Sequence, residues 1–219
     1  MPNCPEWTVD GLVRHVATVY LHKTECIRQQ KLPDPWPPDV SGEPALALLD
    51  RAYAELLAQF SAHKPEEPAN TWYVPEQTVG FWIRRMAQET VIHRVDAEQA
   101  LGEPLAEIPD DLAVDGADEV LVRFLSYQSV VWPEYMAGAL PATALPPLLV
   151  RAGEHAWTVR VNPEEVLVSP PSDQVGATIS GAPAPMLLWL WRRVDDGVER
   201  SGDPAVIDKV YELLKTATQ

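Results

Sequence analysis

The stretch FWIRRMAQETVIHRVD, Phe81 to Asp96, contains neither proline nor glycine and lies inside a longer proline-free window from Glu76 to Glu103. Proline is costly inside a helix, so this window predicts a long helix. Phe81 and Met86 supply apolar residues for its core face, and Gly102 stands where a C′ glycine would end the helix.

Glu89 and His93 stand four residues apart in this expected helix. Side chains at that spacing lie over one another, with about 5–6 Å between their Cβ atoms, so both can reach one metal ion. Asp96 follows three residues later on the same face, where its carboxylate could orient the His93 ring without itself binding the metal. Because an isolated Glu-x-x-x-His on a helix is common on solvated surfaces, a metal site needs a third ligand from another element.

His15 is the candidate for that third ligand. It lies in an earlier proline-free window, Glu6 to Leu32, where Thr8 is the expected N-cap and Leu12 and Val16 mark an inward face. A helix bundle brings such faces together, although a lone histidine there is more often a packed core residue. Two histidines and one glutamate form a known catalytic zinc set and also match non-haem iron, so the ligand set leaves the metal open.

Other reactive side chains on the first expected helix are interpreted as structural. His22 follows His15 by seven residues, about 10.5 Å along the axis, which is too far for both to bind one ion. Cys26 lies one turn further on the same face, so both are read as packing or pocket-lining residues. Cys4 precedes the helix with no base nearby in the sequence, and it is not expected to be a nucleophile.

Two further windows complete a predicted helix bundle. Ser41 is expected to cap a helix that continues to Phe60, and a fourth helical stretch lies between Asp110 and Val131. The apolar face expected for the second helix comprises Leu46, Leu49, Tyr53, Leu56 and Leu57.

The pattern changes after Pro141, where short alternating segments replace long windows. A hairpin is expected at residues 148–161, and further strands at 165–168 and 177–179. Helices are expected after them, at residues 186–194 and 204–215. The expected fold class is therefore α followed by α+β, with a helical domain at 1–140 and a small α+β domain at 141–219.

Composition narrows the possible functions. The 219 residues carry 32 acidic and 17 basic side chains, a formal net charge of −15, which repels nucleic acids and anionic membranes. No apolar run approaches the roughly 20 residues of a membrane span, and residues 1–7 lack the regions of a signal peptide. With only two cysteines there is no disulfide framework, so a cytoplasmic location is expected.

A set of short motifs is spread along nearly the whole chain. They are Cys4–Val9 (CPEWTV), Leu12–Val16 (LVRHV), Phe81–Thr90, His93–Glu98, Leu112–Gly116 (LAVDG), Thr178–Gly181 (TISG), Leu187–Trp191 (LLWLW) and Ser201–Pro204 (SGDP). Together these segments resemble the mycothiol-dependent maleylpyruvate isomerase family.

That resemblance implies a DinB-like helix bundle carrying a divalent metal, usually zinc, with Fe2+ and Ni2+ as alternatives, and an α+β domain beside it. By motif position the metal ligands would be His15, Glu89 and His93, and a catalytic arginine would fall at Arg193 or its neighbour Arg192. The implied enzyme uses a low-molecular-weight thiol such as mycothiol to isomerise or conjugate a small electrophilic, anionic substrate.

Two other functions fit the same three ligands: a hydrolase whose nucleophile is metal-bound water, and a non-catalytic module that binds metal or ligand. The chain also departs from the family, whose members usually carry a further helix before the Cys-Pro-x-Trp motif. Either the start of the protein lies upstream of Met1, or the bundle lacks this helix. A missing helix would expose apolar surface and favour a homodimer.

Overall fold

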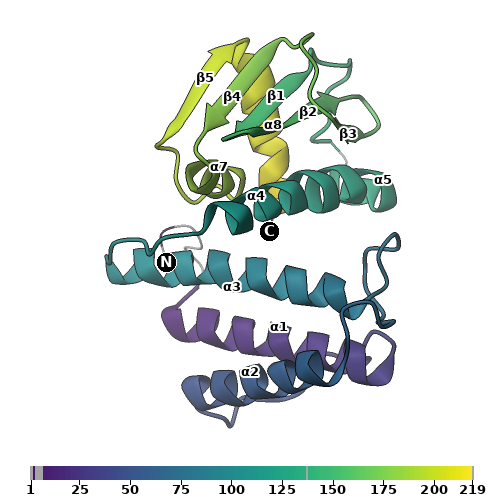
Figure 1. Ribbon diagram of the computed structural model, residues 1–219, viewed down its shortest axis with the longest axis vertical. Coiled ribbons are helices and arrows are strands. Elements are labelled where there is room, and N and C mark those ends of the chain that lie inside the picture. Colours follow the sequence, from purple (N-terminus) through teal and green to yellow (C-terminus); the bar gives the residue numbers. More distant parts are fainter. Residues whose placement is uncertain (1, 3–6, 137, 219) are drawn as a thin grey trace. The chain divides into compact units, whose positions relative to one another are not determined.

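The computed structural model describes all residues except 1, 3–6, 137 and 219, and the chain forms two compact units, Met1–Ala106 and Glu107–Gln219 (Figure 1). The predicted order, a helical region followed by a mixed α+β domain, is confirmed. The boundary expected near residue 141 instead falls inside the second unit. The difference arises because the helical stretch after Asp110 packs with the helices and strands that follow it.

The first unit is helical, and its elements are α1 (Val9–Gln29), α2 (Ala45–Ala62) and α3 (Val79–Leu101). The Thr8 side chain caps α1 as predicted, accepting a hydrogen bond from the backbone N–H of Gly11 at 3.0 Å. Gly102 ends α3 in the left-handed conformation, with φ 71°, as predicted. Figure 1 shows α1 between the other two helices.

The core face of α2 was predicted only in part, because Leu56 is buried and Leu49 packs against the core as expected, whereas other residues of the expected face are exposed. The buried residues of the helix are Leu48, Ala52 and Leu56. Leu46 and Tyr53, expected inside, are 70% and 50% exposed. The error arises because leucine and alanine occur all around this helix, so periodicity does not select one face. The helix also begins at Ala45, because residues 41–43 form a turn and Ser41 provides no cap.

α1 and α3 pack against each other and run in opposite directions. The Tyr20 hydroxyl lies 2.6 Å from Oγ1 of Thr90, and Nζ of Lys23 lies 4.8 Å from the centre of the Trp82 ring. A residue early in α1 therefore faces a residue late in α3. This pairing places His15 opposite the middle of α3.

The second unit opens with a continuous helical stretch, as predicted for residues 110–131. It consists of α4 (Asp110–Asp118), η1 (Glu119–Tyr127) and α5 (Gln128–Val131), with the short α6 (Pro133–Met136) after it. The central segment is a π-helix, whose wider hydrogen-bonding pattern was not predicted. α4 packs against a later helix of the same unit, α7 (Pro183–Leu190).

A five-stranded sheet with the order β3-β2-β1-β4-β5 forms the rest of this unit. Its strands are β1 (Leu148–Ala152), β2 (His155–Val161), β3 (Val166–Ser169), β4 (Ala177–Gly181) and β5 (Val198–Gly202). The predicted hairpin is β1 with β2, and β1 pairs with β4 in parallel. The strand β5 was not predicted, and α8 (Pro204–Ala217) follows it and contacts β4.

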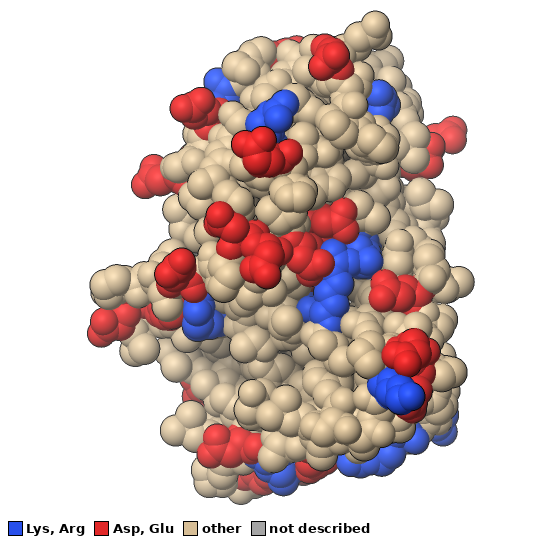
Figure 2. All heavy atoms as spheres, viewed as in Figure 1, with Lys and Arg blue, Asp and Glu red and all other residues tan. Residues whose placement is uncertain are grey.

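Within the described part of the chain, no helix combines the length and apolar character needed to cross a membrane. Figure 2 shows acidic side chains spread over the visible face with fewer basic ones among them. This distribution matches the net charge of −15 and provides no broad basic surface on that face for a nucleic acid.

Candidate metal centre

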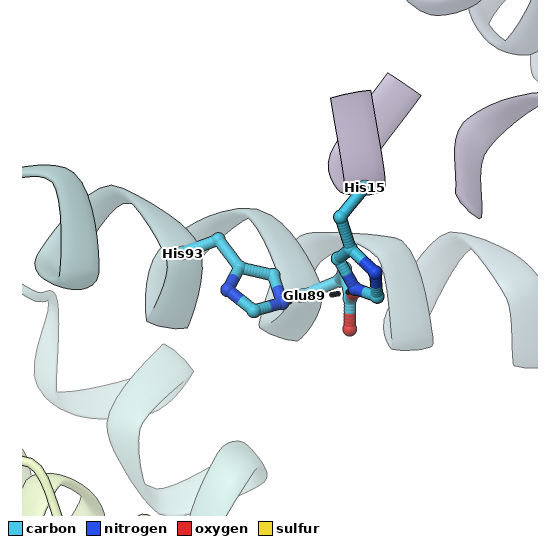
Figure 3. Close-up of side chains that lie close together, drawn as sticks. All are labelled: His15, Glu89 and His93. Carbon is cyan, nitrogen blue, oxygen red and sulfur yellow. Dashed lines mark hydrogen bonds and ion pairs between the residues drawn. The ribbon is translucent and has the colours of Figure 1, made fainter. Parts of the chain in front are cut away.

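The structure brings together the three side chains that the sequence singled out as metal ligands. His15 extends from α1 toward Glu89 and His93, which both project from α3 (Figure 3). Oε1 of Glu89 lies 3.3 Å from Nε2 of His15 and 3.2 Å from Nε2 of His93. One ligand atom from each residue lies within 4.8 Å of the others.

These distances suit a small divalent cation. Zinc binds nitrogen and oxygen ligands at about 2.0–2.1 Å, and two such ligands at tetrahedral angles lie roughly 3.3 Å apart. Both separations to the Glu89 oxygen agree with that value. Three protein ligands leave a position for an exogenous molecule, as in catalytic rather than structural zinc sites.

Glu89 is held as a carboxylate. Burial by itself would raise its pKa, but Arg85 and the two imidazoles outweigh that effect, so the pKa lies well below its ordinary value. The Arg85 guanidinium forms an ion pair with Oε2, which leaves Oε1 toward the histidines. Arg85 lies one helical turn before Glu89, and this spacing could have identified it from the sequence.

The ring of His93 is oriented by Asp96, as the sequence predicted. Nδ1 of His93 lies 3.0 Å from the Asp96 carboxylate, which is almost fully buried. Burial lowers the pKa of His93, but the hydrogen bonds to Asp96 and Glu89 outweigh it and raise the pKa overall. When the ring is neutral and Nδ1–H donates a hydrogen bond to Asp96, Nε2 carries the lone pair and faces Glu89.

An aromatic ring lies against the centre, and the two histidines differ in exposure. The Trp7 ring lies 4.6 Å from the ring of His15 and 6.3 Å from that of His93, between centroids. The side chain of His15 is 37% exposed, whereas that of His93 is 13% exposed. Among the three candidate ligands, His15 is therefore the side chain most exposed to solvent within the described residues.

His22 and Cys26 lie outside this group, in agreement with their interpretation as packing residues. Sγ of Cys26 lies 3.4 Å from Nδ1 of His22. Burial lowers the pKa of His22 to about 4, with a further contribution from Lys23, and burial raises the pKa of Cys26 to about 11. Both groups are therefore neutral near pH 7. Cys4 lies outside the described residues.

The two candidate arginines belong to the second unit. Arg193 donates a hydrogen bond to the carbonyl oxygen of Trp191 at 2.8 Å. Arg192 adopts a positive φ of 59°, and its guanidinium lies 5.0 Å from the ring of Tyr211. A catalytic role for Arg193 stays a prediction, as does the choice between the two neighbours.

Comparisons with known proteins agree on one family. The model of the mycothiol maleylpyruvate isomerase N-terminal domain matches residues 1–98, and that of the MDMPI C-terminal domain matches residues 111–209. Two crystal structures of the mycothiol-dependent maleylpyruvate isomerase, one of a mutant, resemble the chain with TM-scores of 0.60 and 0.57. Their sequence identities are 16% and 18%, and each match covers 90% of this chain and 79% of the other. No curated protein matches the sequence.

Proposed function

Because the chain belongs to the mycothiol-dependent maleylpyruvate isomerase family, we propose that it is a metal- and thiol-dependent enzyme acting on a small, electrophilic, anionic substrate. The reaction is isomerisation of a double bond, or conjugation where the thiol stays attached. The observation that carries the proposal is the convergence of His15, Glu89 and His93.

Each residue of the centre has a distinct task. His15, Glu89 and His93 would hold a divalent cation, which lowers the pKa of a bound thiol and so supplies the thiolate as nucleophile. Arg85 keeps Glu89 ionised and pairs with its Oε2, so that Oε1 faces the place where the metal ion would bind.

Three further side chains assist these ligands. Asp96 holds the ring of His93, and Trp7 covers one side of the centre. Arg193 would bind a substrate carboxylate through two parallel hydrogen bonds.

Addition of the thiol and its later elimination account for isomerisation, because every bond that forms with the thiol is broken again. A C–S bond forms at one carbon of a conjugated double bond, whose electron pair moves toward a neighbouring carbonyl group. The former double bond is then single and can rotate. Departure of the same thiolate restores the double bond in the other geometry, and no oxidant or reductant is consumed.

The ligand assignment is tested by measuring the metal content of purified variants. We expect Glu89→Ala and His93→Ala to lose stoichiometric metal, because each removes one of three donors, while their far-ultraviolet circular dichroism stays that of the wild type. The control is His155→Ala, which removes an exposed histidine on β2. Stoichiometric metal in both ligand variants would refute the assignment.

The thiol requirement separates the enzyme from its two alternatives. Turnover of maleylpyruvate by the metal-loaded protein should require added mycothiol. Hydrolysis without thiol would favour the hydrolase, in which bound water is the nucleophile. Saturable metal binding with no turnover of any electrophile, with or without thiol, would favour the non-catalytic module.

A further inference from the structure

Lys23 is a partly buried cation near the metal centre with no carboxylate beside it. It projects from α1, and its Nζ lies 3.2 Å from Nδ1 of His22 and 4.8 Å from the centre of the Trp82 ring on α3. Among the described residues, no Asp or Glu forms an ion pair with it. Its near neighbours His22 and Cys26 are neutral near pH 7 and cannot balance its charge.

This arrangement is costly in the absence of a ligand. A cation removed from water is ordinarily paired with an anion, because desolvation disfavours the charged form. Burial is the largest influence on Lys23 and lowers its pKa to about 8, and Arg85 lowers it further, against the attraction of Glu89. The Trp82 ring face offers partial compensation. Lys23 thus remains mostly protonated at pH 7 and unneutralised.

Lys23 lies on the same surface of contact between α1 and α3 as the metal centre. It follows His15 by eight residues, about 12 Å along the helix axis. Its Nζ lies beside the ring of Trp82, which precedes Glu89 by seven residues, or about two turns, on α3. Glu89 and Arg85 both act electrostatically on its pKa.

Lys23 has no ion-pair partner among the described residues. Arg85 is paired with Glu89, and the Asp96 carboxylate lies against His93, so neither carboxylate neutralises Lys23. The chain as a whole carries a net charge of −15. A cation that is retained without such a partner near a candidate active centre, in so acidic a protein, indicates a site for an anionic group.

We propose that Lys23 binds a carboxylate of the substrate while the reactive carbon of that substrate lies at the metal centre. This inference rests on the proposed function and extends it, since it assigns a substrate-binding residue in the first unit. The substrate class is a small carboxylic acid with an electrophilic double bond. Its carboxylate supplies the charge that the described residues around Lys23 do not.

The test measures binding of maleate to the metal-loaded protein by isothermal titration calorimetry. Lys23→Met removes the charge but keeps an apolar stem of similar length, and we expect its affinity for maleate to fall at least about tenfold, as for loss of a charge-assisted hydrogen bond. Lys23→Arg should retain most of the affinity. Lys31→Met, which removes an exposed lysine just beyond α1, is the matched control and should bind as the wild type does.

Two further readouts make the result specific. Metal content and mycothiol affinity should be unchanged in Lys23→Met, since neither involves the substrate carboxylate. Equal maleate affinity in Lys23→Met and wild type overturns the proposal, as does weakened mycothiol binding alone, or no saturable maleate binding by the wild type. Maleate binding is measured without turnover. Absence of isomerase activity would therefore refute the proposed function, while the comparison of maleate affinities would still test the role of Lys23.

Discussion

At the scale of single residues, the geometry of the candidate metal centre depends on side chains that would not themselves bind the ion. Asp96 fixes the ring of His93, and Arg85 fixes one oxygen of Glu89. The sequence predicted that Glu89, His93 and Asp96 share one helix face, because helical spacing defines that face, and that a bundle would bring His15 toward it. It did not predict Lys23, because its importance depends on the lack of a neighbouring carboxylate among the described residues, which only the folded chain reveals.

Asn in place of Asp96 should weaken metal binding without abolishing it. The amide carries no negative charge to support the proton on Nδ1 of His93, and loss of such a partner costs about 10–100-fold in metal affinity. Competition with a chromogenic chelator measures the change. Glu98→Gln serves as control, because Glu98 pairs with Arg94 on the same helix, away from the three ligands. An affinity equal to that of the wild type would show that Asp96 is not needed to orient the ring.

At the scale of elements, proline and capping residues determined how well the helices could be predicted. α1 begins and α3 ends at the predicted residues because Thr8 and Gly102 are unambiguous local signals. The core face of α2 was predicted only in part, with Leu56 buried and Leu46 exposed, because apolar residues occur on every side of that helix. The edge strand β5 has largely exposed residues and no apolar alternation, so only its pairing with β4 defines it.

The N-cap of α3 should contribute to stability but not to metal affinity. Oγ1 of Thr78 accepts a hydrogen bond from the backbone N–H of Phe81 at 3.2 Å. Thr78→Ala should lower the free energy of unfolding by about 1 kcal/mol, the usual cost of losing a cap. Urea unfolding of metal-free protein measures it, and Thr78→Ser, which keeps the hydroxyl, should be close to wild type. Equal stability of the alanine variant and the wild type would contradict this role.

At the scale of the whole molecule, the proposed tasks are divided between two compact units. The candidate metal ligands lie in Met1–Ala106 and the candidate catalytic arginine lies in Glu107–Gln219. The change from long helical windows to short alternating segments predicted the fold class. It did not predict this boundary, because residues 110–131 are helical like the first unit but pack with the second. The expected cytoplasmic location and homodimer stay predictions.

Substitution of Arg193 should separate catalysis from metal binding. Arg193→Gln should retain stoichiometric metal, since all three ligands belong to the other unit. Loss of hydrogen bonds to a charged group costs about 1.5–3 kcal/mol, so thiol-dependent turnover should fall by roughly tenfold or more. Arg200→Gln, which removes an ion pair with Asp195, is the control. Full turnover in Arg193→Gln would transfer the role to Arg192 or remove it from this segment.

His15 on α1 and Glu89 on α3 stand 74 positions apart in the chain. A cation held by both would close a long covalent and coordinate ring, restricting the denatured ensemble much as a cross-link does. Loss of the ion would remove that restraint. Exchange of bound metal for a heavier isotope would measure how often the ligands release the ion in the native protein.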